Sequence, residues 1–163
     1  MSSFKVVELS FDPIDQTPSL EDEFVLIDSV DSGVGEYLWF PPDLVTENAR
    51  IMITTYDMVG LYDSDTTNSF SIIDTWSPSV EVYLISDFLS IAEYDTMDIS
   101  WSAYDNIQLD SVFIYFSIDS GNTFSLISQS FYDQTNISYA IPYGVTDNGI
   151  IKVEAVDIYG NVG

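Results

Sequence analysis

Apolar and polar residues alternate with a period of two along much of the chain. The clearest run comprises Met97, Asp98, Ile99, Ser100, Trp101, Ser102 and Ala103. A second run spans residues 151–155, where Lys152 and Glu154 separate three apolar residues. Such alternation is typical of a β-strand that buries one of its faces.

Strands can be placed between clusters of turn-forming residues. After Ser77 the pattern predicts six of them, at residues 80–86, 96–104, 111–118, 124–128, 136–141 and 149–157. Asp119–Asn122 and Tyr159–Asn161 carry the glycine and asparagine residues expected in tight turns. No stretch shows a credible helical pattern. Because short strands at this spacing favour a sandwich, the sequence predicts an all-β fold.

Two stretches of the chain repeat each other at a constant separation of 100 residues. The matched residues are Pro42, Val45, Thr46, Asn48, Ile51, Asp57 and Gly60, which recur as Pro142, Val145, Thr146, Asn148, Ile151, Asp157 and Gly160. On the same offset, Phe24, Leu26 and Ile27 recur as Phe124, Leu126 and Ile127. A repeat of fixed length predicts tandem modules. A module of about 100 residues has the size of a β-sandwich domain.

The repeat predicts two modules, both incomplete in this window. Residues 1–74 form the C-terminal part of one module, whose first two strands are missing, and its closing strand is expected at Asn68–Ile73. Residues 75–163 form the following module, whose last strand is missing. The strand around Val7 matches residues 112–118 best when Ser10 is aligned with Ser117, an offset of 107. Asp74–Pro78 is then a short junction, which favours a semi-rigid rod.

Two explanations of the incomplete modules stay open. The window can be an excerpt from a longer tandem protein. Alternatively, it can be a filament subunit whose sandwich is completed by donor strands from a neighbouring chain. An open sheet edge and core need some such completion, because unpaired backbone and exposed apolar surface are unfavourable.

Three motifs carry a family resemblance. They are ISWSAYDN at Ile99–Asn106, VFIYFSIDSGNTF at Val112–Phe124 and IKVEAVDIYGN at Ile151–Asn161. Together they resemble the immunoglobulin-like, fibronectin type III-like tandem repeats of bacterial secreted and cell-surface proteins. The resemblance implies an extracellular location and a structural role, as a surface stalk, an adhesin spacer or a filament subunit. Sandwiches of this kind host many unrelated roles, so the functional part is an analogy.

Charge and composition exclude several classes of function. The chain has 27 acidic and 3 basic residues, a net charge of −24, so nucleic acid is not an expected partner. Histidine and cysteine are absent, which removes thiolate chemistry, imidazole zinc sites and the usual base of serine nucleophiles. No apolar stretch is long enough for membrane insertion. We therefore expect no catalysis. The acidity is expected to keep a long polymer soluble or to suit a saline habitat.

Calcium is the one cofactor that the sequence suggests. Asp105 and Asp157 each continue the buried parity of a strand, and the two strands are expected to lie in opposing sheets and to run toward the same end. Their carboxylates would then meet there, with Asp74 as a further ligand from the junction and Asp57 at the matching place in the first copy. Calcium prefers such oxygen ligands, but no standard calcium-loop spacing is present. The alternative is that these residues only form turns.

The expected partners are neighbouring copies of the same repeat, possibly in a homopolymer. A glycan- or protein-binding module is the alternative function, through an outward aromatic row formed by Tyr83, Phe113 and Tyr115. Trp39, Trp101, Phe116 and Tyr139 fall at inward or strand positions and are predicted to belong to the core. Asn136–Ser138 fits the N-glycosylation pattern.

Overall fold

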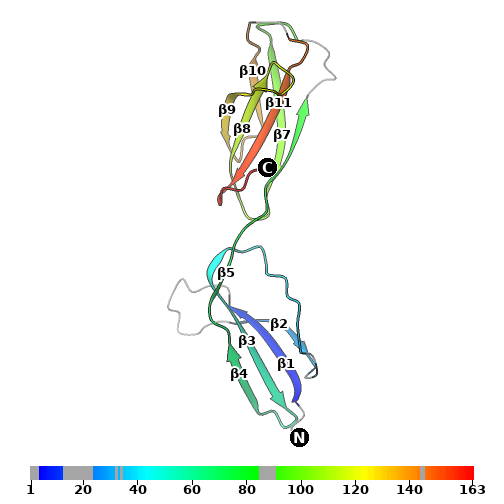
Figure 1. The fold of residues 1–163 in the computed structure, drawn as a ribbon, viewed down its shortest axis with the longest axis vertical. Helices are drawn as coiled ribbons and strands as arrows, with labels where there is room; N and C mark the ends of the chain where they lie inside the picture. The colour runs from blue at the N-terminus through cyan, green and yellow to red at the C-terminus, as the bar shows by residue number, and fades with distance from the viewer. Residues whose placement is uncertain (1–3, 13–23, 32, 34, 85–90, 144–145) are drawn as a thin grey trace. The chain divides into compact units, whose positions relative to one another are not determined.

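The computed structural model describes residues 4–12, 24–31, 33, 35–84, 91–143 and 146–163, with backbone alone for residues 4–12 and 84. These residues form β-strands and no helix, so the predicted all-β class is confirmed for them. No helix in this described part of the chain could cross a membrane. The chain divides into two compact units, Met1–Asp74 and Thr75–Gly163 (Figure 1).

The second unit is a two-layer arrangement of antiparallel strands, consistent with a β-sandwich (Figure 1). One sheet has the order β10-β7-β6 and the other the order β11-β8-β9. The strands are β6 (Ser79–Leu84), β7 (Thr96–Tyr104), β8 (Leu109–Ser117), β9 (Ser125–Phe131), β10 (Asn136–Ala140) and β11 (Ile150–Asp157). All six lie where the alternation predicts strands, with ends that differ by a few residues.

The two sheets of the second unit enclose one apolar core. Its buried members are Met97, Ile99 and Trp101 from β7, Val112 and Ile114 from β8, and Val153 and Ala155 from β11. Ile99 and Ile114 are 0 % exposed, and burying a side chain of that size contributes about 1.5–3 kcal/mol. Tyr139 packs against this core, and its ring lies 5.8 Å from that of Phe116. The core therefore comes from the residues whose period-two parity predicts burial.

The first unit has a single described sheet of order β2-β1-β3-β4, with β5 pairing to the start of β3. The strands are β1 (Phe4–Asp12), β2 (Val25–Val30), β3 (Thr46–Asp57), β4 (Tyr62–Thr66) and β5 (Phe70–Ile72). Among the described side chains of this unit, only Ala49 and Thr54 are buried. Its described part thus lacks an apolar core like that of the second unit.

The central strand pairs of the two units have the same register. Phe4 pairs with Asp57 as Leu109 pairs with Asp157, and in both pairs the register shifts at the next step. The residues of β1 therefore correspond to those of β8 at an offset of 105. The offset of 107 expected from the sequence is wrong by two residues, because it matched residue types rather than backbone positions.

The outer strand pairs also agree. The pairing of β1 with β2 shifts register after Leu9, and the pairing of β8 with β9 shifts after Ile114, which is the same place at an offset of 105. An irregularity of this kind is a local feature that bends the strand and changes its twist. Two such features at matching positions give both sheets the same local layout.

The turns after β3 and β11 are built alike. Oδ1 of Asp57 accepts two backbone N–H groups, from Val59 and Leu61 at 2.9 Å each. Oδ1 of Asp157 accepts the matching pair, from Tyr159 at 2.8 Å and Asn161 at 2.9 Å. The glycine of each turn has a left-handed φ, +87° at Gly60 and +90° at Gly160, which glycine adopts without strain.

The strand that follows this turn in the first unit was not predicted. The sequence placed a closing strand at Asn68–Ile73, but β5 covers only Phe70–Ile72, and β4 pairs along β3 directly after the turn. All five residues of β4 are exposed, so apolar alternation cannot reveal it. In the second unit, Val162 forms a bridge to Val156 at the position where Tyr62 pairs with Tyr56.

Candidate metal centre

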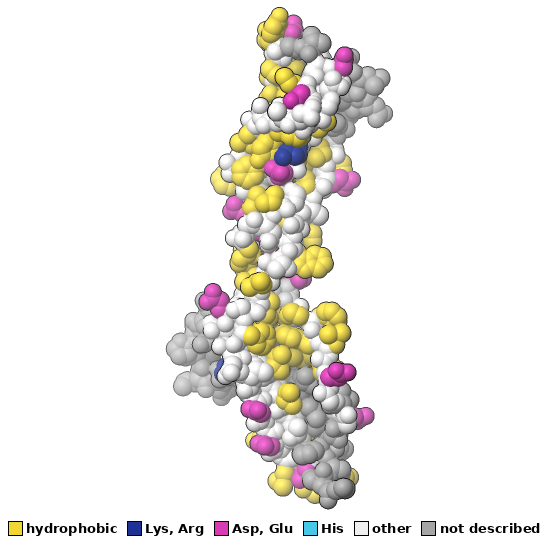
Figure 2. Space-filling model, in the orientation of Figure 1, with side chains coloured by type: hydrophobic (Ala, Val, Ile, Leu, Met, Phe, Trp, Pro, Cys, Tyr) yellow, Lys and Arg dark blue, Asp and Glu magenta, His cyan; other side chains and the backbone are white. Residues whose placement is uncertain are grey.

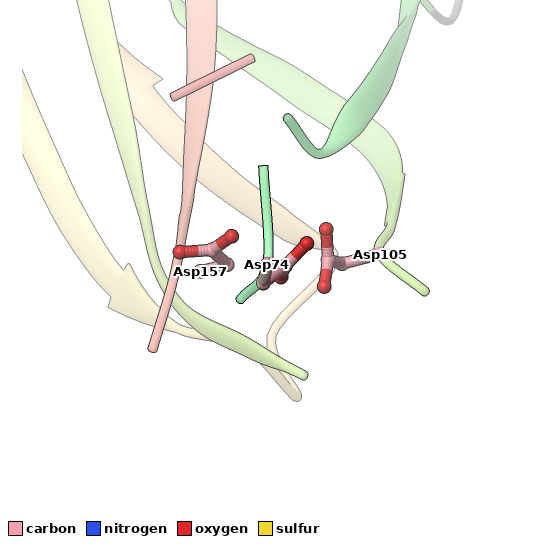
Figure 3. Close-up of side chains that lie close together, drawn as sticks. All are labelled: Asp74, Asp105 and Asp157. Atoms are coloured by element: carbon pink, nitrogen blue, oxygen red, sulfur yellow. The ribbon is translucent and has the colours of Figure 1, made fainter. Parts of the chain in front are cut away.

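Three carboxylates meet at one end of the second unit. Asp105 directly follows β7 and Asp157 ends β11, so the two residues come from opposite sheets. Asp74 is joined to Thr75, the first residue of this unit. One carboxylate oxygen of each residue lies within 4.8 Å of the others, and Figure 3 shows the three side chains side by side. The structure thus brings together Asp105 and Asp157, with the Asp74 that the sequence offered as a further ligand.

Asp157 is the buried member of this group, with 2 % of its surface exposed. Besides the two turn N–H groups, its Oδ2 accepts a hydrogen bond from Nδ2 of Asn161 at 2.7 Å. Burial alone would raise the pKa of this carboxyl. The hydrogen bonds from Asn161, Tyr159 and Gly160 outweigh burial and lower the pKa below its usual value. Asp157 is therefore an anion at neutral pH.

Asp105 presents one satisfied and one unsatisfied oxygen. Its Oδ2 accepts backbone N–H groups from Ile107 at 2.9 Å and Gln108 at 3.0 Å. Its Oδ1 is buried and accepts no hydrogen bond from the protein. A buried carboxylate oxygen without a donor is unfavourable by a few kcal/mol. A cation or a water molecule at this position would remove that penalty.

The chemistry of the cluster suits a hard divalent cation. Calcium binds carboxylate oxygens in flexible geometry, and three close carboxylates repel one another until a positive charge lies between them. The lysine of this unit is engaged elsewhere. Lys152 forms an ion pair of 3.0 Å with Glu154 and stacks on the rings of Tyr115 and Phe124. Figure 2 shows acidic side chains spread over the visible surface and few basic ones.

Asp57 is not part of such a group. Its carboxylate accepts the turn N–H groups of the first unit, as a turn-forming aspartate does. Asp63 and Asp65 lie on β4 and accept the N–H groups of their own next residues. Among the described residues, the carboxylate group found around Asp105 and Asp157 is not repeated around Asp57.

A pair of exposed tyrosines is a surface feature that the sequence did not point to. Tyr94 and Tyr143 are 72 % and 77 % exposed, and their rings lie 6.2 Å apart. Tyr94 also has a φ of +70°, which is uncommon for a residue with a side chain. The predicted outward row is only partly exposed, because Lys152 covers the ring of Tyr115. No periodic signal links two loop residues almost fifty positions apart.

No protein-family model matches the chain, and no curated protein matches it. Function is therefore proposed from the residues and geometry of the chain itself.

Proposed function

We propose that the chain is a structural part of an extracellular repeat protein, built from immunoglobulin-like or fibronectin-like β-sandwich modules of about 100 residues. The observation that carries this proposal is the shared strand layout of the two units. Both have the same central register, the same outer shift and the same aspartate–glycine turn. Two adjacent copies of one sheet support a tandem array, and tandem arrays provide length and mechanical continuity.

Calcium at the carboxylate cluster would strengthen this role. It would neutralise the repulsion within the cluster and satisfy Oδ1 of Asp105. It would also tie Asp74, through which the chain enters the second unit, to the loops after β7 and β11. Fewer conformations at that point make a stalk stiffer. This calcium role is part of the proposal and rests on the fit of the three side chains.

Single-molecule pulling of the chain tests the structural role. At about 3.5 Å per extended residue, unfolding of residues 75–163 should release about 30 nm in one step. Trp101→Ala should lower the force of that step, because Trp101 is 3 % exposed in the core. Smooth extension of the second unit, with no resolved step, would contradict a load-bearing module.

A glycan- or protein-binding module is the second candidate. It is favoured by Tyr94 and Tyr143, which present two large rings to solvent, one of them on strained backbone. Exposed aromatic rings stack on sugar faces or anchor protein partners. A glycan array and a double Tyr94→Ser, Tyr143→Ser variant test this role. Binding that the variant keeps would exclude these rings as the site.

A further inference from the structure

The sheet of the first unit has an open apolar face where the same sheet of the second unit is covered. At matching positions of β3 and β11, Ile53 is 43 % exposed and Val153 is 8 % exposed. In the second unit this face packs against Met97, Ile99 and Trp101 of β7. The described residues of the first unit include no strand that corresponds to β6 or β7.

A second part of the first unit also lacks its partner. Residues 36–40 correspond to β10 at the repeat offset of 100. In the second unit, Asn136–Ala140 is a strand because each of its residues pairs with one of β7. Residues 36–40 carry a similar apolar content, yet they form no strand. Leu38 and Phe40 are each 79 % exposed. Both the open face and the unpaired segment therefore lack the same neighbour.

We infer that this face and residues 36–40 together form a docking site for one pair of antiparallel strands of the β6–β7 type, tethered within the same polypeptide. The inference rests on the proposed modular architecture and adds to it the place and pattern of the missing contact. The inner strand carries apolar residues at alternate positions, faces Ile51 and Ile53, and pairs with residues 36–40 as β7 pairs with β10.

Stoichiometry argues against a second copy of the chain as the donor. Each copy has two sheets of the β9-β8-β11 type, but only one β6–β7 pair in its described residues. That pair is already used to cover the core of the second unit. Exchange of strands between copies would therefore close one site by opening another, and half of the sites would stay open.

The size of the face argues against a free partner. Four strands at about 4.8 Å spacing, each contributing about six residues of 3.3 Å, give a face of roughly 400 Å². A stable complex buries about 800 Å² on each partner. A tethered segment needs no such area, because its effective concentration is in the millimolar range.

A fusion protein tests the inference directly. A copy of residues 77–107 is joined ahead of Ser3, which preserves the connection length of the second unit because β1 and β8 correspond at an offset of 105. The matched control carries serine in place of the copied Met97, Ile99 and Trp101. A third sample is the unaltered 163-residue chain with the same 31-residue segment added as a free peptide, at about 100 µM, well below the effective concentration of a tether. The readout is amide hydrogen exchange at residues 36–40 and at Ile53.

In the fusion, exchange at these amides should slow by about 100-fold or more, since native pairing protects them. The serine control and the free peptide should each give less than about a tenth of that protection. Unchanged exchange in the fusion, or equal protection by the serine control, would overturn the docking site. Full protection by the free peptide would overturn the tether. Pulling of the second unit is independent of this result, so failure of the proposed function would be seen separately.

Discussion

Calcium should stabilise the second unit through Asp105 and its two neighbouring carboxylates. Extracellular calcium modules have dissociation constants of about 0.1–1 mM. With a value of about 0.3 mM, 10 mM calcium would add roughly 2 kcal/mol to the free energy of unfolding. For a unit of this size, that corresponds to a rise in Tm of roughly 10 °C.

Asp105→Asn separates calcium binding from turn formation. The asparagine keeps an oxygen for the N–H groups of Ile107 and Gln108, but it removes one of three charges that lie within 4.8 Å. Repulsion across 4.8 Å amounts to roughly 1–3 kcal/mol per pair, depending on the local dielectric. Without calcium the variant should therefore be at least as stable as the parent, and calcium should add nothing to it.

The assay is thermal unfolding followed by circular dichroism, with chelator, calcium, magnesium or sodium chloride at matched ionic strength. Asp110→Asn is the control, because it removes the same charge from an exposed position of the same unit. It should keep the full calcium effect. Equal stabilisation of the parent and Asp105→Asn would refute the metal centre. An equal effect of sodium chloride would leave only screening of the net charge.

Three further predictions concern the fold. Ile114→Ala should destabilise the second unit by about 3–4 kcal/mol in urea unfolding, because Ile114 is 0 % exposed, whereas Leu126→Ala on the next strand, 54 % exposed, should cost less than about 1 kcal/mol; similar losses would contradict the assigned core. The N–H and hydroxyl of Thr123 and the hydroxyl of Ser117 hold the pKa of Asp119 below its usual 3.8, so its stabilisation is complete above that pH and is lost as pH falls below it. Asp119→Asn should therefore flatten the loss of stability between about pH 4 and pH 2 in acid titration, and an unchanged slope would exclude this turn as a source. Gly160→Ala should destabilise by about 1 kcal/mol or more, because φ is +90° there, and a neutral effect in thermal unfolding would mean that the turn relaxes.

The alternation of residues predicts the second unit well because burial there follows strand parity. Met97, Ile99 and Trp101 occupy every other position of β7, and all three are buried. β4 escapes prediction because it has no buried face and forms only through pairing with β3. Residues 36–40 fail in the opposite sense, since they have the composition of a strand but no partner among the described residues. Local pattern thus predicts a strand only where tertiary pairing is available.

The candidate site was predictable in part. The parity of Asp105 and Asp157 placed both carboxylates at one end of opposing sheets, and the structure has them there. Asp57 shares the sequence context of Asp157 but not its neighbours, since the described first unit has no counterpart of the loop after β7. Sequence repetition therefore reproduced the turn and not the cluster. Tyr94 and Tyr143 meet only through the folding of two loops, which leaves no periodic trace.

The shared layout of the two sheets is tested most directly by solution NMR of the whole chain, through cross-strand contacts between backbone protons. The structure predicts that Phe4 lies opposite Asp57, that Leu109 lies opposite Asp157, and that register shifts follow Leu9 and Ile114. Contacts that place β1 at any other offset against β3, or a shift present in only one of the two sheets, would contradict the claim that both units are copies of one sheet.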